Sequence, residues 1–320
     1  MLDDKILIFF KQNIDSYVSG EELSETLGVS RTAVWKHIEK LRAEGYEIAA
    51  SPHLGYKLMT VPDRLTEIEL KWKLNTDVIG RKVYSFGEIA STNDAAYNLA
   101  ISGEKEGAVV TAEYQTKGRG RLGRKWVSPR GKGVYLSVIL RPDTLLREIP
   151  VITLFSALSV ARTIRDETGL PALIKWPNDT LIYNRKVSGI LTELNGEADM
   201  VNFVIVGIGV NINTKKELLP EGGTSIFAEK GIQISRVEFT RRLLRNIDRY
   251  YSIFKNGNKS RIIKEHKELS AILDKRVQVN YHNHSISGYA VDVDKEGALI
   301  VRLDSGFNER VLAGDVILLR

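Results

Sequence analysis

The sequence feature that most restricts the fold is a basic, glycine-rich run between residues 117 and 132. It contains seven lysines and arginines, four glycines and no acidic residue. Closely spaced glycines and like charges disfavour both helix and strand, so the run predicts a loop. Glycines let the backbone present its N–H groups to a ligand. The guanidinium of an arginine can donate two hydrogen bonds to two oxygens of the same phosphate or carboxylate. We expect a mobile anion-binding loop that becomes ordered when an anion neutralises its charge.

The glycine spacing in this run excludes the commonest nucleotide-binding loops. The run has no Gly-x-x-x-x-Gly-Lys-Ser/Thr motif. Gly118, Gly120 and Gly123 have the spacing of a dinucleotide-binding motif, but residues 124–126 do not open an obvious helix, so this match is weak. Taken alone, the run is also compatible with nonspecific nucleic-acid contact or with a solvated turn.

Length and composition limit the class of protein. With 320 residues, 43% of them hydrophobic and 27% charged, the chain is long enough for two or three globular domains. It contains no cysteine, which excludes disulfides and thiolate metal sites. The sequence has no apolar run of the ~20 residues that span a bilayer and no signal-peptide pattern, so we expect a cytoplasmic protein without membrane contact.

Residues 1–62 predict a winged helix-turn-helix domain. Ser19 and Ser30 are each placed to cap a short helix, and Gly28 is placed to end the first of the two. Two short helices separated by such a turn are typical of the helix-turn-helix. The segment holds seven basic and nine acidic residues, so its pattern, and not the sequence pI of about 9.2, supports DNA binding.

The second helix of this pair, residues 31–41, is expected to enter a major groove. Two short strands follow it, at 46–48 and 55–58, and would form the wing. Winged helices also serve as protein-contact modules, which is the alternative for this domain. The exposed face of the helix supplies the predicted DNA-binding residues, which are Arg31, Thr32, Trp35, Lys36, His37 and Lys40.

Residues 63–270 predict a central α+β domain, with a mixed sheet and helices on one face rather than a doubly wound parallel sheet. Residues 271–320 predict a third domain, a small SH3-like β-barrel, because five short strands and several glycines fall within fifty residues. The central domain is expected to contain strands at 109–113, 134–140, 173–176, 180–183, 186–194 and 203–211, helices at 95–101 and 152–164, and a helix that Ser235 caps.

Four other segments accompany the basic loop. They are Ser91-Thr92-Asn93 with Gln115, Lys-Trp-Pro-Asn-Asp at 175–179, Arg-Lys-Val-Ser-Gly-Ile-Leu at 185–191, and the glycine-broken strand 206–213. Together with the Gly-Arg-Gly-Arg-x-Gly-Arg loop they closely resemble the biotin protein ligases, and this resemblance runs the length of the chain. The helix-turn-helix head is similar to that of the bifunctional subgroup, which is both a ligase and the biotin operon repressor.

The resemblance implies a fold and a reaction. The central domain would be class II synthetase-like. The enzyme would be a biotin–[biotin carboxyl-carrier protein] ligase that forms biotinyl-5′-AMP from biotin and ATP and transfers biotin to a lysine of a carrier domain, as in acetyl-CoA carboxylase. Mg²⁺ would arrive on ATP, without a dedicated metal site on the protein. With biotinyl-5′-AMP as corepressor, the protein would bind operator DNA as a homodimer.

The resemblance also implies the site residues. Lys186 and Arg121 would bridge the biotin carboxylate and the α-phosphate, and Arg119 would hold the loop closed; these three are the catalytic residues. Biotin binding is assigned to Ser91, Thr92, Asn93, Gln115, Arg119, Gly120, Arg121, Lys186 and Gly189. ATP or adenylate binding is assigned to Arg121, Arg124, Trp126, Asn178, Lys186 and Asn211.

Some points stay open at the level of sequence. Many relatives have a tryptophan in the loop that folds over the adenylate, and this chain has none there, so Ile226 or Phe227 is expected to cover the adenine. Asp179, next to the Lys-Trp-Pro-Asn motif, is more typical of a turn brace than of a catalytic base. A lipoate-type ligase and a non-catalytic transcription factor that senses a small molecule are the alternative functions.

Overall fold

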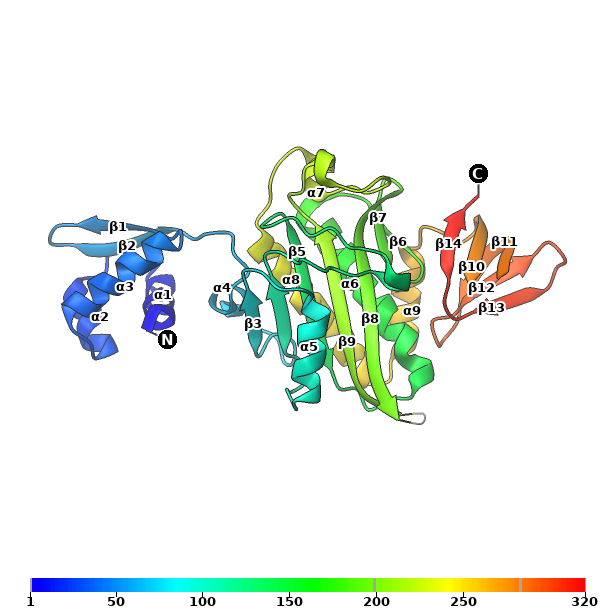
Figure 1. Cartoon of the computed structure of the whole chain (residues 1–320), viewed down its shortest axis with the longest axis horizontal. Coiled ribbons are helices and arrows are strands. Elements are labelled where there is room, and N and C mark those ends of the chain that lie inside the picture. Colours follow the sequence, from blue (N-terminus) through cyan, green and yellow to red (C-terminus); the bar gives the residue numbers. More distant parts are fainter. Residues whose placement is uncertain (1, 198–199, 282–283, 320) are drawn as a thin grey trace. The chain divides into compact units, whose positions relative to one another are not determined.

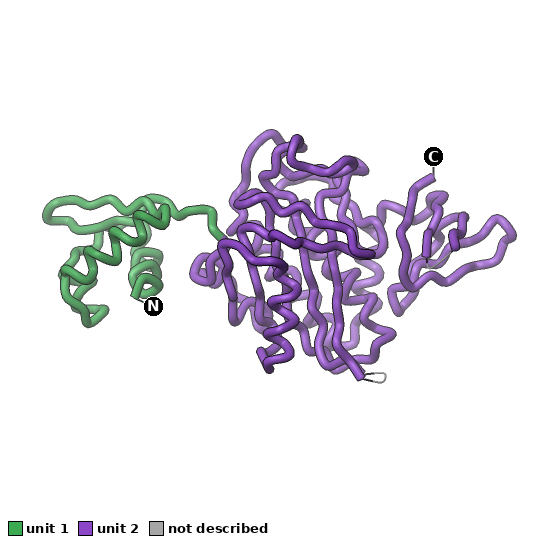
Figure 2. The backbone as a smooth tube through the Cα atoms, in the orientation of Figure 1, with its two compact units in different colours: residues 1–64 green, residues 65–320 purple. Residues whose placement is uncertain are grey.

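The computed structural model describes residues 2–197, 200–281 and 284–319 of the chain. Its contacts divide it into two compact units, residues 1–64 and residues 65–320 (Figure 2). The expected boundary between the second and third domains, at residue 270, lies inside the larger unit.

The smaller unit is the predicted winged helix-turn-helix. Ser19 Oγ accepts the Glu22 N–H at 3.0 Å and Ser30 Oγ accepts the Ala33 N–H at 3.2 Å, as the capping pattern predicts. Gly28 ends the second helix with φ at 65°. Its elements are α1 (Leu2–Gln12), α2 (Gly20–Leu27), α3 (Arg31–Ala43) and an antiparallel hairpin of β1 (Glu47–Ser51) and β2 (Gly55–Thr60).

A seven-stranded mixed sheet forms the centre of the larger unit (Figure 1). Its strand order is β3-β4-β5-β9-β8-β7-β6, and only the β3–β4 pair is parallel. The strands are β3 (Val83–Phe86), β4 (Val109–Ala112), β5 (Gly133–Leu140), β6 (Ala172–Lys175), β7 (Asp179–Ile182), β8 (Arg185–Glu197) and β9 (Met200–Asn211).

Helices cover both faces of this sheet, which corrects the expectation of helices on one face. The apolar residues of α6 (Ile149–Thr168) and α8 (Arg236–Lys255) belong to the large core on one face. On the other face, α5 (Thr92–Ile101) packs Ala96 and Ala100 against β4, β5 and β9, and Figure 1 shows α5 on the opposite side of the sheet from α6. The α5 face carries a much smaller apolar core, which leaves room for a polar site.

The C-terminal part of the larger unit is a five-stranded antiparallel sheet, as predicted. Its inward-facing residues, such as Val277 and Val301, belong to the same apolar core as α6. In addition, Trp176 Nε1 donates to the Gly297 carbonyl at 2.9 Å. This sheet is therefore tied to the central one. Its order is β13-β12-β11-β10-β14, with β10 (Arg276–Tyr281), β11 (His284–Val293), β12 (Leu299–Leu303), β13 (Asn308–Val311) and β14 (Asp315–Leu318).

Other differences from the sequence-based expectations are local. The helix expected at 152–164 extends over the whole of α6. The turn between β7 and β8 consists of Tyr183 and Asn184, both with positive φ, one residue earlier than expected. Three elements had not been expected as such, because they are short or largely polar: β3, α7 (Ile226–Lys230) and α9 (Lys259–Glu268). The sequence predicts a helix that follows residue 65 and ends near Asn75, and α4 (Glu67–Lys71) is this helix, although it ends earlier.

Candidate functional site

The predicted ligand-binding residues converge on the sheet face that α5 covers. The floor of this pocket includes Gly189 of β8 and Gly207 and Gly209 of β9. A Cβ atom at Gly207 would lie 2.1 Å from Asn93 Oδ1, and one at Gly209 would lie 2.4 Å from the Trp126 ring. The glycines therefore provide the space that these side chains occupy. The pocket brings together Ser91, Thr92, Asn93, Gln115, Arg119, Gly120, Arg121, Arg124, Trp126, Asn178, Lys186 and Gly189.

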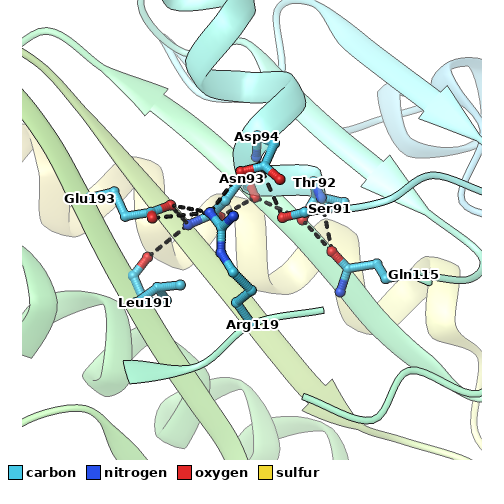
Figure 3. Close-up of polar contacts among 9 residues, drawn as sticks. Ser91, Thr92, Asn93, Asp94, Gln115, Arg119, Leu191 and Glu193 are labelled. Atoms are coloured by element: carbon cyan, nitrogen blue, oxygen red, sulfur yellow. Dashed lines mark hydrogen bonds and ion pairs between the residues drawn. The ribbon is translucent and has the colours of Figure 1, made fainter. Parts of the chain in front are cut away.

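The N-terminus of α5 forms one wall of the pocket (Figure 3). Ser91 caps the helix, because its Oγ accepts the Asp94 N–H at 3.4 Å. Thr92 and Asn93 are about 95% buried. Gln115 Oε1 accepts the Thr92 N–H at 2.8 Å and lies 3.1 Å from the Thr92 hydroxyl, which joins this wall to the start of the basic loop.

Ser137, a fully buried residue of β5, contributes a hydroxyl that touches the same wall. Its Oγ lies 2.6 Å from Asn93 Oδ1 and 2.8 Å from Thr92 Oγ1. An amide oxygen only accepts, so Ser137 donates to Asn93. Thr92 then has one proton for two acceptors, Ser137 Oγ and Gln115 Oε1. One of these two contacts therefore always lacks a proton between its oxygens. An oxygen lone pair of the wall then stays available to a hydrogen-bond donor of a ligand.

The arginines of the basic loop are held by groups that lie outside the loop. Arg119 pairs with two carboxylates from α5 and β8, and Arg130 pairs with Glu88. Arg121 Nη1 donates to Asn178 Oδ1 at 2.8 Å and to the Gly314 carbonyl at 3.3 Å. The expected self-repulsion of the empty loop is thus offset by partners from other elements. Whether the loop is mobile without ligand stays a prediction.

The C-terminal sheet contributes directly to the pocket. Asp315, the first residue of β14, lines it and forms an ion pair with Arg124. Burial lowers the pKa of the Arg121 guanidinium, and the nearby Asp315 carboxylate partly offsets that effect. An arginine keeps its charge at neutral pH in such surroundings. The loop therefore presents a partly desolvated cation to the pocket, and an anion binds such a cation strongly.

Lys186 stands at the start of β8, beside the glycine floor. Its Nζ lies 2.7 Å from Asp179 Oδ1 and 5.8 Å from the centre of the Trp126 ring, and its side chain is 38% exposed. The backbone of Lys186 is bracketed by the loop after β9, because its N–H donates to the Gly222 carbonyl and its carbonyl accepts the Thr224 N–H. These contacts fix the position of the ammonium group at the pocket.

Asn211 is the one predicted ligand-binding residue that does not line the pocket. It is 5% exposed, and its Nδ2 donates to the Thr224 carbonyl at 3.0 Å. Neither residue expected to cover the adenine lines the pocket. Ile226 is fully buried in the main apolar core, and Phe227 lines a separate hollow with Arg185. The residue of this loop that does line the pocket is Pro220.

Several residues of the site were not expected from the sequence. Ser137 could have been found as the one serine or threonine in the largely apolar strand 133–140. Glu193 could have been found by alternation along β8, which places it on the same face as Gly189 and Leu191. No local pattern in the sequence marks Asp315, because it belongs to the C-terminal sheet and follows Arg124 by 191 positions in the sequence.

The predicted DNA-binding face of the smaller unit is built differently. Of the six predicted residues, His37 is half-buried and the other five are exposed. Asp3 of α1 pairs with His37 and, at 2.6 Å, with Lys40 Nζ, and Arg31 pairs with Glu21 of α2 at 2.6 Å. The hydrogen bond that Lys40 donates to the Asp3 carboxylate raises the pKa of Lys40. Local acids thus orient part of a solvent-exposed face.

Membrane spans and metal clusters are both absent from the described residues. Within the described residues, no helix is both long and apolar enough to span a membrane. Nor does that part of the chain contain a cluster of three or more His, Cys, Asp or Glu side chains arranged to hold a metal ion.

Family models match each part of the chain. Residues 4–57 match an HTH domain, residues 86–211 match the biotin/lipoate A/B protein ligase family, and residues 272–319 match the biotin protein ligase C-terminal domain.

Individual relatives and solved structures match as well. The chain is 36% identical over 315 residues to the bifunctional ligase/repressor BirA of Bacillus subtilis, with 97% of both chains covered, and 32% identical to that of Escherichia coli, with 94% of this chain and 92% of the relative covered. Among solved structures, the biotin protein ligase from Aquifex aeolicus in complex with biotin and ATP matches 75% of this chain and 99% of its own, with a TM-score of 0.65 and 29% identity.

Proposed function

We propose which pocket residues bind biotin, which bind ATP and which act in the reaction, on the premise that the chain belongs to the family of bifunctional biotin ligases and repressors. The protein is an ATP-dependent biotin protein ligase with a helix-turn-helix repressor head. The observation that carries the proposed division is the convergence of Arg119, Arg121 and Lys186 with the polar wall of α5 on one glycine floor.

Biotin takes the part of the pocket between α5 and the start of the loop. Its ureido group offers a carbonyl and two N–H groups, which suit the donors and acceptors of Ser91, Thr92 and Gln115. The acceptor lone pair left unused around Thr92 accepts a hydrogen bond from one of the ureido N–H groups. Asn93, Gly120 and Gly189 shape the space around the ring, and Arg119 closes the loop over it.

ATP takes the side with Arg121, Arg124, Trp126 and Asn178. In the first step, a biotin carboxylate oxygen attacks the α-phosphorus and pyrophosphate leaves, which yields biotinyl-5′-AMP. Two anions must meet, so fixed cations aimed at the reacting oxygens supply most of the catalysis. Arg121 and Lys186 do this. Mg²⁺ enters on the ATP oxygens, because hard cations prefer phosphate and carboxylate ligands. Asn211 acts indirectly, by holding the loop at Thr224.

In the second step, a neutral lysine amine of an acceptor domain attacks the mixed anhydride and AMP leaves. The acceptor is a biotin carboxyl carrier domain of acetyl-CoA carboxylase or a similar enzyme. Asp179 is committed to Lys186 at 2.7 Å, so we assign it the role of holding that ammonium group rather than that of a general base. A closed loop retains the anhydride and protects it from water and stray lysines.

Repression requires a homodimer that places two heads on two half-sites of operator DNA, with biotinyl-5′-AMP as corepressor. An edge for pairing is available. Strand β7 pairs with β8 only as far as Gly189, and Asn178 binds the backbone of Ile190, so no described strand pairs with the outer edge of residues 191–197. Leu194 and Met200, in the same region, are exposed hydrophobic residues. We place this activity in the cytoplasm, where ATP, acceptor and operator meet.

The ligase assignment is tested by incubating the protein with ATP, an acceptor domain, and labelled biotin or labelled lipoate. We expect label on the acceptor with biotin and none with lipoate. Labelling with lipoate instead would identify a lipoate-type ligase, and no labelling with either acid would indicate a non-catalytic sensor. Dimerisation is tested by sedimentation with and without biotinyl-5′-AMP; if the ligand does not strengthen self-association, repression does not work through a ligand-linked homodimer.

A further inference from the structure

Two carboxylates outside the basic loop hold the guanidinium of Arg119 (Figure 3). Arg119 Nη2 lies 2.7 Å from Asp94 Oδ1 and 3.1 Å from Glu193 Oε1. Burial alone would lower the pKa of Arg119, but the two carboxylates outweigh that effect and raise it. The three residues come from three different elements, since Asp94 belongs to the first turn of α5 and Glu193 to β8.

Glu193 reaches this position through the alternation of β8. Gly189, Leu191 and Glu193 lie on one face of the strand, and the first two line the pocket. Glu193 follows them along the same face, where its side chain is 34% exposed. A carboxylate at the margin of the ligand pocket is costly to desolvate, and Arg119 offsets that cost.

The same carboxylate also fixes Asn93. Asn93 Nδ2 donates to Glu193 Oε2 at 2.6 Å, while Asn93 Oδ1 accepts the Ser137 hydroxyl. A carboxylate only accepts hydrogen bonds, so it holds the Asn93 amide with its nitrogen toward β8. The direction of the bonds through Ser137 and Thr92 follows from that orientation. Glu193 therefore acts on both the arginine and the polar wall of the pocket.

We propose that Asp94 and Glu193 form a two-carboxylate clamp that positions Arg119, and through Asn93 the polar wall of α5, for biotin binding. Neither acid needs to touch the reacting atoms, so both are positioning residues. This inference rests on the proposed function, in which Arg119 closes the loop over biotin.

The geometry explains how the clamp helps binding. Among the described residues, Arg119 makes its ion pairs through Nη2 alone, which leaves the donors on Nε and Nη1 for a ligand. An arginine on a glycine-rich loop otherwise has many rotamers and loses that freedom on binding. The clamp removes part of this loss in advance, and preorganisation of that kind strengthens binding without a new ligand contact.

A purely structural role is the competing explanation. An acidic residue in the first turn of a helix stabilises that helix, and Asp94 occupies such a position in α5. That role would change the melting temperature and would leave biotin affinity unchanged. The two explanations are therefore separated by a direct measurement of biotin binding in the absence of ATP.

The test compares Glu193→Gln and Asp94→Asn with Glu197→Gln, an exposed glutamate on the same strand. We expect each clamp variant to weaken biotin binding about tenfold, as the loss of a partly exposed charged contact does, with KM for ATP and the melting temperature nearly unchanged. Glu197→Gln should bind biotin like the wild type. Glu193→Asp, which keeps the charge, should recover part of the affinity. If Glu193→Gln does not fold, biotin binding by Asp94→Asn, a substitution on the surface of α5, provides the test instead.

Arg119→Ala separates failure of the clamp from failure of the proposed function. If both hold, Arg119→Ala weakens biotin binding and adding Asp94→Asn to it has little further effect, because the Asp94 carboxylate acts through Arg119. Normal biotin binding by Glu193→Gln and Asp94→Asn, with weak binding by Arg119→Ala, overturns the clamp alone. Normal binding by Arg119→Ala overturns the role of Arg119 in the proposed function, and the clamp with it.

Discussion

The basic loop of the larger unit and the basic helix of the smaller unit use positive charge in opposite ways. In the loop, Arg119, Arg121 and Arg124 are each held by residues from distant parts of the chain. In α3, Trp35 and Lys36 are exposed, and the partners of Lys40 and Arg31 come from neighbouring helices of the same small unit. One set of cations lines a pocket, and the other lies on one face of a helix.

The difference follows from what each region is proposed to bind. A reaction between two anions needs cations whose positions are set before the ligand arrives, because reorganisation during the reaction is costly. DNA presents a regular row of phosphates, and exposed cations gain affinity there by releasing counterions. Net charge does not reveal this distinction, since residues 1–62, which hold the predicted DNA-binding helix, include more acidic than basic residues.

The largest effect should come from removing Lys186. Its ammonium group is fixed by Asp179 and bracketed by the loop after β9, so no other group replaces it. We expect Lys186→Ala to slow adenylate formation about a thousandfold, as the loss of a preorganised charge does. Pyrophosphate release measures this. Lys216→Ala, in the nearby 3₁₀ turn Lys216–Leu218, is the control. A drop in both variants would mean that total charge, and not position, matters in this region.

The second effect concerns stability in acid. His266 of α9 is fully buried, and neither ring nitrogen has a hydrogen-bond partner among the described residues. Burial lowers its pKa from 6.5 to about 4. The unfolded chain therefore binds a proton near pH 6.5 that the folded chain binds only near pH 4. The stability that the neutral imidazole provides is present above pH 6.5 and is lost as the pH falls toward 4, by about 3 kcal/mol in all.

Denaturant unfolding at pH 7 and pH 5 measures this loss. His266→Phe should lose less stability between these pH values than the wild type does. His53, which is exposed on the wing, provides the control through His53→Gln. An unchanged pH dependence in His266→Phe would assign the acid sensitivity to carboxylates instead. A positive result would extend the comparison, because this acid-sensitive group lies in the larger unit and not in the head.

A smaller effect is expected from Arg121→Gly. Its side chain joins the loop to Asn178 and to the C-terminal sheet, so its loss should open the loop rather than abolish adenylation. We expect the variant to form biotinyl-5′-AMP and to release it about tenfold more readily, as weakening a partly buried charged contact implies. Indiscriminate labelling of bystander proteins would report the release. Complete loss of adenylate formation would show that Lys186 alone cannot support the first step, and that retention of the intermediate is not the main role of Arg121.

The smallest effect separates the two regions by salt. We expect operator affinity to fall steeply with salt concentration, and Lys36→Ala to lower the slope of that dependence by about one. Biotin affinity should depend little on salt, because Arg119 and Arg124 are already paired with carboxylates and Arg121 is partly buried. Fluorescence anisotropy with a labelled operator, and biotin binding over the same salt range, provide the comparison. Equal salt dependence of the two affinities would remove the distinction between fixed and exposed cations.

The sequence predicted those parts of the fold that depend on near neighbours. Caps at Ser19, Ser30 and Ser235 and the strand patterns at 186–194 and 203–211 are local signals, and the structure contains each of these caps and strands. Short or polar elements were missed, because β3 has four residues and α9 buries only Ile262, Ile263 and His266.

The site divides in the same way. The glycine-arginine loop and the Lys-Trp-Pro-Asn motif pointed to pocket residues, since each motif is contiguous in the sequence. The carboxylates that hold them are not contiguous with them. Asp94 and Glu193 meet at Arg119 although 99 residues separate them, and neither lies in a motif. Such pairs depend on strand order and register, which no local pattern specifies. The same reason explains why Asp315 was not expected.

The contact between Arg124 and Asp315 also bears on the order of synthesis. A ribosome makes the loop, the glycine floor and Lys186 well before it makes Asp315, which follows Arg124 by 191 residues. A growing chain therefore has the groups proposed to activate biotin before it has the residues that help to hold the loop. Placing one side of the pocket so late in the chain leaves a period of synthesis in which an incomplete protein could release a reactive acylating agent among newly made proteins.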